Sequence, residues 1–193
     1  MSRQLVIASN NRHKIDEIQA ILGDQYTLIT MNELGYTDEI DETGDTLEAN
    51  ALIKAKALRK ITPLPIISDD SGLEVPALQN APGVYSARYA GPEKNNQNNM
   101  NKLLTELSGN NNRTAQFRTV LCLLLDNTTH LFEGVVSGSI VEQPRGKNGF
   151  GYDPVFQPDG FSSTFAELQP EVKNNISHRK RAVEKLSMFI QSA

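Results

Sequence analysis

The sequence of 193 residues has little of three things, and each shortage excludes a class of protein. It has one cysteine, Cys122, so it can form no internal disulfide, and the apolar neighbours of this thiol predict a buried side chain rather than a nucleophile or redox switch. No apolar run approaches the roughly 18 residues of a membrane-spanning helix, so we expect no membrane partner. Polar residues follow Ala8 at once, a pattern unlike a signal peptide, and the cytoplasm is the expected location.

Basic residues are also scarce, because 19 Lys and Arg stand against 23 Asp and Glu, for a formal net charge of -4. A mildly acidic chain has no broad attraction for nucleic acid or for anionic membranes, and we expect neither as a partner. A small basic pocket could still hold a polyanion. The positions of the few cations are therefore more informative than their sum.

What remains is the composition of an ordinary globular protein, with 38% hydrophobic and 22% charged residues. No internal repeat and no Pro/Ser-rich linker divides the chain, so we expect residues 1–193 to form a single domain. Strand-like runs alternate with helical periodicity, and a long β-prone pair follows. This order predicts an α/β fold with a mixed sheet flanked by helices.

The expected strands are apolar or β-prone runs at 5–8, 65–68, 116–125, 130–141 and 152–156, with 126–129 as a hairpin loop. The expected helices carry apolar residues at helical spacing, from the loop 9–14 to Leu22, from Asp45 to about Lys60, and over 98–107. A closing helix would place Ile176, Val183, Leu186 and Phe189 on one face. Asp45 is the expected N-cap of the second helix, with Glu48 as its capping-box partner.

Four polar clusters lie at strand ends or helix starts, where open α/β sheets usually bind ligands. The first follows the opening strand and contains Ser9, Asn10, Asn11, Arg12, His13 and Lys14. Backbone N–H groups at a helix start, together with Lys14, suit a phosphate. It is not a Walker A loop, because the glycines of that pattern are absent. The alternative interpretation is a polar turn with a capping residue.

The second cluster is an acidic stretch from Glu33 to Glu48 that contains no Lys or Arg. Most of these acids are expected to be solvated, and the segment 41–44 just before the second helix is the part most able to point inward. Lys54 follows Leu47 by about two turns of that helix. It would face the same ligand if the helix lies along the site, and would otherwise be an exposed lysine.

The third cluster contains Asp69 and Asp70 at the end of a buried strand, followed by Ser71 and Gly72. Adjacent strand residues point to opposite faces, so the two acids are expected to have different roles. Buried carboxylates need a partner, and Mg²⁺ commonly binds one or two of them together with substrate phosphates. One Asp could instead take a proton from water, or the segment could be a turn with capping side chains.

The fourth cluster combines a glycine-flanked aromatic with later basic residues. Glycines beside Phe150 allow the backbone to approach a flat ligand, and an aromatic face can stack a base. His178 and Arg179 offer donors to a ring edge that bears a carbonyl. A core phenylalanine and a solvated helix start are the alternatives.

Taken together, the clusters resemble the inosine triphosphate pyrophosphatase family, whose members hydrolyse deaminated purine nucleoside triphosphates. The resemblance covers nearly the whole chain in order. Its motifs are Ser9-Asn10-Asn11-x-x-Lys14, Glu42-Thr43-Gly44, Glu48-x-Asn50-Ala51-x-x-Lys54-Ala55, Asp69-Asp70-Ser71-Gly72-Leu73, the segment Pro82 to Tyr89, Gly149 to Pro154, and Ser177-His178-Arg179.

The resemblance implies a role for each motif. The loop 9–14 and Lys54 would bind phosphates, Asp70 would be proton acceptor and Mg²⁺ ligand, Asp41 or Glu42 would be the second metal ligand, and Ser71 would lie beside the substrate. The implied base-binding set is Phe150, Gly151, Tyr152, Asp153, Lys173, His178 and Arg179. It further implies an elongated α/β fold with a cleft between two lobes, and a homodimer.

One position departs from the family pattern. Many relatives carry Gly immediately before the loop lysine, where this chain has His13. The substitution adds a titratable neighbour to the phosphates. We expect little change in activity, because the lysine itself is present.

The expected activity is Mg²⁺-dependent hydrolysis of ITP, dITP and XTP to the monophosphate and pyrophosphate, which cleanses the nucleotide pool. Two alternatives remain. One is another nucleotide hydrolase, such as a phosphatase acting at the γ phosphate or a pyrophosphatase for a modified pyrimidine. The other is a nucleotide- or RNA-binding module without catalysis, which the paired Asp69 and Asp70 and the acidic charge disfavour.

Overall fold

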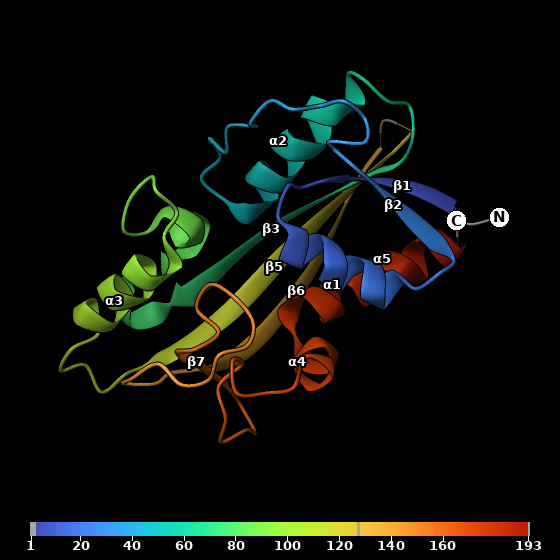
Figure 1. The fold of residues 1–193 in the computed structure, drawn as a ribbon. Coiled ribbons are helices and arrows are strands. Elements are labelled where there is room, and N and C mark those ends of the chain that lie inside the picture. The colour runs from blue at the N-terminus through green and yellow to red at the C-terminus, as the bar shows by residue number, and fades with distance from the viewer. Residues whose placement is uncertain (1–2, 127, 193) are drawn as a thin grey trace. The chain divides into compact units, whose positions relative to one another are not determined.

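The computed structural model describes residues 3–126 and 128–192. Its strands are β1 (Arg3–Ala8), β2 (Tyr26–Thr30), β3 (Ile66–Val75), β4 (Ala81–Pro82), β5 (Thr114–Leu125), β6 (Thr128–Ile140) and β7 (Phe156–Pro158) (Figure 1). Its α-helices are α1 (Arg12–Leu22), α2 (Leu47–Arg59), α3 (Asn96–Glu106), α4 (Pro170–Ile176) and α5 (His178–Ser192). Two short 3-10 helices, at Pro76–Leu78 and Gly83–Arg88, flank β4.

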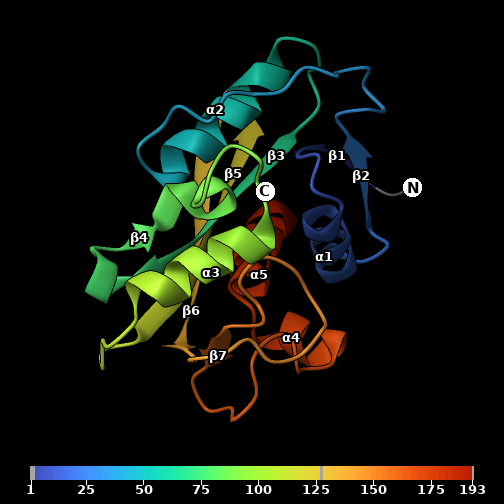
Figure 2. The same cartoon turned by 60° about the vertical axis from the view of Figure 1, so that its left-hand side comes forward.

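The strands form one 7-stranded mixed sheet in the order β2-β1-β3-β5-β6-β7, with β4 on β3. The strand β1 is parallel to β2 and to β3, whereas β4 is antiparallel to β3 and β7 is antiparallel to β6 (Figure 2). Parallel strands next to one another require crossover connections, which α1 and α2 supply. The predicted α/β fold with a mixed sheet flanked by helices is confirmed.

The chain divides into two compact units, each with its own core. The first comprises residues 1–70, 119–134 and 179–193, and the second comprises 71–118 and 135–178. In the first unit α1 and α5 pack on β1, β2 and β5, through residues such as Ile18, Leu28 and Leu186. In the second, Phe117, Phe156 and Phe165 form the aromatic centre. The cleft implied by the resemblance, and a single domain over 1–193, stay predictions.

Two expected boundaries are wrong. The N-cap of α2 is Thr46, whose side chain accepts a hydrogen bond from the Ala49 backbone N–H at 3.1 Å, and not Asp45 with Glu48. The strand expected over 65–68 does not stop at Asp69. It continues as β3 to Val75, because both aspartates have cationic partners that allow them to be buried in the sheet.

Three further errors lie between residues 126 and 176. Residues 152–155 form turns closed by hydrogen bonds such as that from the Val155 N–H to the Tyr152 carbonyl, and β7 begins only at Phe156. Ile176 ends α4 rather than joining the closing helix, because Ser177 is extended (φ -67°, ψ 154°) and separates α4 from α5. In the expected hairpin loop, residues 128 and 129 already belong to β6, and residue 127 lies outside the described residues.

Cys122 lies within β5 and is completely buried, as its apolar neighbours predict. Burial raises the pKa of its thiol to about 11, so the reactive thiolate is rare at neutral pH. The structural interpretation of this cysteine is therefore favoured over a nucleophile. Within the described part of the chain, no helix has the length and apolar character needed to cross a membrane.

Candidate active site

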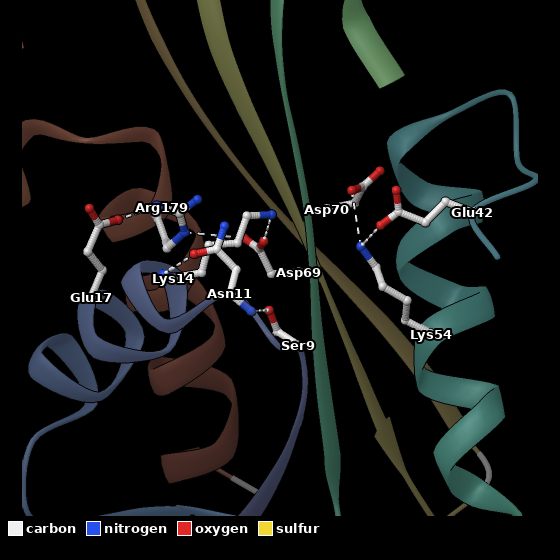
Figure 3. A network of polar contacts seen from close by, with 9 residues as sticks. All are labelled: Ser9, Asn11, Lys14, Glu17, Glu42, Lys54, Asp69, Asp70 and Arg179. Carbon is white, nitrogen blue, oxygen red and sulfur yellow. Dashed lines mark hydrogen bonds and ion pairs between the residues drawn. The ribbon is translucent and has the colours of Figure 1, made fainter. Parts of the chain in front are cut away.

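The strand β3 carries two adjacent carboxylates to opposite sides of the first unit's sheet. Asp69 faces α1 and α5, and Asp70 faces α2 (Figure 3). This separation follows from strand geometry, in which successive side chains alternate between faces. The two acids therefore have different partners, and their different roles stay a prediction.

Asp70 is held in a partly buried ion-pair cluster with Lys54 and Glu42. The Lys54 ammonium donates to Glu42 Oε1 at 2.8 Å and to Asp70 Oδ1 at 3.1 Å (Figure 3). Lys54 is only 8% exposed, so it is not the solvated helical lysine that remained an alternative. The segment before α2 is fixed in turn by Asn50, whose side-chain oxygen accepts from the Gly44 N–H at 2.8 Å.

Burial and charge act in opposite directions in this cluster. Burial raises the pKa of Asp70, and Lys54 offsets only part of that effect. Burial alone would lower the pKa of Lys54, but Asp70 and Glu42 outweigh it and hold the pKa above its ordinary value. A carboxylate with a raised pKa next to a charged lysine is an arrangement that suits proton transfer.

The residues around Asp70 fit a Mg²⁺ ion. Asp70 Oδ2 is buried and has no hydrogen-bond partner among residues 3–126 and 128–192, so it leaves one hard oxygen ligand available. Glu42 contacts the same Lys54 ammonium as Asp70 does, whereas the Asp41 side chain is exposed. In the described chain no three acidic, His or Cys side chains gather as a metal cage. Two carboxylates are what Mg²⁺ needs when substrate phosphates complete its coordination.

The loop 9–14 is built as a helix start, as predicted. Asn11 is the N-cap of α1 and accepts from the Lys14 N–H at 3.3 Å, and Ser9 Oγ accepts from the Asn11 N–H at 3.2 Å. Arg12 is exposed and pairs with Asp16 one turn later, and Asn10 and His13 are also exposed. The N–H groups of a capped helix start form a site for anions.

On the face of β3 opposite Asp70, the Asp69 carboxylate links the start of α1 to α5 through two ion pairs. Lys14 Nζ contacts Asp69 Oδ1, and Asp69 Oδ2 lies 3.3 Å from Arg179 Nε. Arg179 also donates through Nη1 to Glu17 (Figure 3). Burial opposes the ionisation of Asp69, but Lys14 and Arg179 outweigh it and hold its pKa below the usual range.

In the second unit, Asp153 organises the segment expected to bind the base. Its Oδ2 accepts from the Phe150 N–H at 2.8 Å and from Lys173 Nζ at 2.8 Å. The Lys173 ammonium lies 5.0 Å from the centre of the Phe150 ring, within cation–π range. Gly149 permits this arrangement, since a Cβ there would lie 2.0 Å from Asp153 Oδ2.

Other residues predicted to lie in the site make specific contacts or have defined backbone conformations. His178 is 5% exposed and stacks on Phe117, with ring centres 4.9 Å apart and an interplanar angle of 11°. The Tyr152 hydroxyl donates to the Ser86 carbonyl at 2.9 Å. Gly151 has a positive φ of 60° that favours glycine, and Ser71 directly follows Asp70 on β3.

The predicted residues thus fall into separate groups within each unit. The first unit brings together Ser9, Asn11 and Lys14 with Arg179, and Lys54 with Glu42 and Asp70. The second unit brings together Phe150, Asp153 and Lys173. Sequence reasoning missed Glu17 and gave Asp69 no partner. The available signal was the position of Glu17 three residues after Lys14 on the same helix, which places both on one face.

Solved structures define the class by fold. A HAM1 protein from Coxiella burnetii matches with a TM-score of 0.92 at 42% identity, over 99% of this chain and 100% of that one. The Staphylococcus aureus Ham1 protein matches with a TM-score of 0.90 at 42% identity, over 98% and 99% of the two chains. This chain therefore has the α/β fold of Ham1 proteins.

Sequence comparison then gives the family. The Ham1 family model matches residues 5–189. The chain is 47% identical to a Flavobacterium psychrophilum protein named dITP/XTP pyrophosphatase, over 98% of this chain and 100% of that protein. It is 44% identical to a Bacillus subtilis protein of the same name, over 98% of each. The chain belongs to the Ham1 family, and the resemblance indicated by its motifs is confirmed.

Proposed function

We propose that this protein hydrolyses the deaminated purine nucleoside triphosphates ITP, dITP and XTP to the nucleoside monophosphate and pyrophosphate. The observation that carries the proposal is the buried Asp70 with its available Oδ2, next to Lys54 and Glu42. Relatives named dITP/XTP pyrophosphatase support the proposal, because this chain matches 100% and 98% of the length of two of them. The proposal makes the protein a hydrolase of nucleotide metabolism that removes non-standard purines from the nucleotide pool.

In the proposed reaction, the oxygen of water bonds to the α phosphorus and the bond from that phosphorus to the bridging oxygen breaks. Asp70 orients the water and accepts its proton at a carboxylate oxygen, and the pyrophosphate leaves with the electron pair. Lys14 and Lys54 hold the phosphates in line, so that positioning supplies much of the acceleration. Asp70 and Glu42 would hold Mg²⁺, which when bound neutralises charge on the pyrophosphate.

Selectivity for deaminated purines would come from the second unit. We propose that Phe150 stacks the base and that His178 donates to its 6-oxo group. The resemblance also assigns this task to Arg179, whose guanidinium pairs with Asp69 and Glu17 in the structure. Adenine presents an amino donor at the same position, so a buried protein donor would be left unpaired, which discriminates strongly.

A panel of ITP, XTP, GTP and ATP, each with Mg²⁺ and product identification, tests the proposal. We expect ITP and XTP to be turned over at least about a hundredfold more efficiently than ATP, with pyrophosphate as the first product. Equal turnover of all four would contradict the proposed selectivity. Orthophosphate as first product would instead indicate a γ phosphatase.

A pair of substitutions distinguishes the two adjacent acids proposed as metal ligands. Mutation of a residue that only hydrogen-bonds to a metal ligand lowers metal affinity by about 10- to 100-fold. Loss of a ligand itself should cost at least as much, so Glu42→Gln is expected to raise the Mg²⁺ concentration for half-maximal activity by at least about tenfold. Asp41→Asn should change this Mg²⁺ concentration by less than about twofold, because the charge that it removes is exposed and screened by solvent ions. Magnesium titrations of both variants measure this, and the reverse ranking would assign the ligand to Asp41.

We also propose that the protein acts in the cytoplasm as a homodimer, in line with the resemblance. Light scattering coupled to size-exclusion chromatography measures the mass directly. A mass equal to that of one chain at micromolar concentration would contradict the dimer.

A further inference from the structure

Asp69 is a completely buried carboxylate that the proposed reaction does not use. Its two oxygens are paired with cations from two different helices, Lys14 on α1 and Arg179 on α5. A buried carboxylate is costly unless it is paired, and this one has a charged partner on each side.

The contacts of Asp69 belong to a chain of charges that returns to its starting helix. Arg179, which is 1% exposed, is held on its other side by Glu17. Glu17 lies three residues after Lys14 on α1, so the contacts run from Lys14 through Asp69 and Arg179 back to α1 (Figure 3). The two cations balance the two carboxylates.

The position of Lys14 allows its ammonium to contact Asp69 and a substrate phosphate at the same time. Its ammonium contacts the fully buried carboxylate of Asp69, while the Lys14 side chain as a whole is 16% exposed, so the lysine joins a buried anion to a site that solvent and ligands can reach. An ammonium has three donors, so contact with Asp69 leaves donors for a phosphate oxygen. A long lysine side chain otherwise loses rotamer freedom when it binds a ligand, and a fixed carboxylate reduces that cost.

We propose that Asp69 is a positioning residue that holds the Lys14 ammonium ready for the substrate phosphates, with Arg179 and Glu17 fixing Asp69 from behind. The inference rests on the proposed function and deepens it. It gives the adjacent aspartates separate tasks, because Asp70 acts at the reacting phosphate and Asp69 acts only through Lys14. Arg179 then contributes to phosphate binding through Asp69, whatever it does at the base.

A double-mutant cycle measured with XTP tests this proposal. Asp69→Asn preserves shape and removes the charge. We expect kcat/KM to fall about 10- to 100-fold, which lies within the range of coupling energies in one ion-pair network, with most of the loss in KM. In a Lys14→Met background Asp69→Asn should change kcat/KM by less than about threefold, because the ammonium through which Asp69 acts is absent.

Glu17→Gln provides a second, milder cycle that does not require removal of the buried Asp69. We expect a loss of about three- to tenfold in kcat/KM that also disappears in the Lys14→Met background. The matched control is Glu184→Gln, which removes an exposed carboxylate from its pair with the half-exposed Lys180 on α5 and should leave activity unchanged.

The outcomes separate this inference from the function on which it rests. Losses that multiply fully with that of Lys14→Met would overturn the positioning role and indicate a general effect on folding. A raised Mg²⁺ requirement in Asp69→Asn would also overturn it, by placing Asp69 among the metal ligands. Wild-type protein without activity on XTP and ITP would instead refute the proposed function, and would do so before any variant is compared.

Discussion

Asp70→Asn is expected to lower turnover of XTP by at least about a thousandfold, within the range that a positioned general base contributes. The amide has nearly the same shape as the carboxylate but neither accepts the proton of water nor supplies a charged oxygen to Mg²⁺. The fold should survive, because Lys54 keeps its contact with Glu42. Steady-state kinetics with XTP measure the loss.

Nucleotide binding distinguishes loss of chemistry from loss of the site. Calorimetric titration of the Asp70→Asn variant should show an affinity within about tenfold of that of the wild type, since Lys14 and the loop remain. Asp38→Asn is the matched control, because it makes the same exchange at an exposed acid of the stretch before α2. A variant that keeps more than about a tenth of wild-type turnover would show that Asp70 is neither the base nor an essential metal ligand.

Gly149→Ala is expected to disrupt the base-binding group of the second unit. The added Cβ would lie 2.0 Å from Asp153 Oδ2, which holds the Phe150 N–H and Lys173. Asp153 must therefore move, and loss of hydrogen bonds to a charged group costs about 1.5–3 kcal/mol each. We expect the KM for XTP to rise at least about tenfold, as the stacking platform is no longer fixed.

Gly151→Ala separates this collision from simple backbone strain. Both glycines have positive φ, 75° and 60°, so alanine is strained at either position. Among the described residues, however, no atom beyond the two chain neighbours lies within 4 Å of a Cβ added at Gly151. Urea unfolding should therefore show Gly149→Ala to be less stable than Gly151→Ala by about 1.5–3 kcal/mol. Equal free energies of unfolding would mean that the contact with Asp153 has no energetic role.

Local patterns predicted the parts of the fold that local physics decides. The apolar run before Ser9 is β1, and the spacing of Ile15, Ile18 and Leu22 is the buried face of α1. The capped helix start at Asn11 also follows from residue type alone. These features depend on neighbours within one turn or one strand, which the sequence displays directly.

Features that depend on distant partners could not be predicted in this way. Asp69 and Asp70 look like a loop by polarity, but they lie inside β3 because Lys14 and Lys54 neutralise them after folding. Glu17 has no visible significance until Arg179, 162 positions away, packs beside it. Local periodicity carries no information about such pairs. The family resemblance gave roles to single residues but did not show which of them contact one another.

The turn-rich segments were the other source of error. Residues 152–155 have strand-like composition, yet the positive φ of Gly149 and Gly151 and the hydrogen bonds of Asp153 fold the segment into turns. Position-specific backbone conformations of this kind depend on the tertiary contacts of Asp153. The same contacts make the segment a candidate binding site rather than a strand.

The bond that is cleaved tests the central claim most directly. Hydrolysis of XTP by the wild-type protein in water enriched in heavy oxygen, followed by mass spectrometry of both products, shows which phosphorus accepts the water. Attack at the α phosphorus, next to Asp70, predicts that the label appears in the monophosphate and that pyrophosphate stays unlabelled. Label in pyrophosphate, or labelled orthophosphate as the first product, would contradict the account.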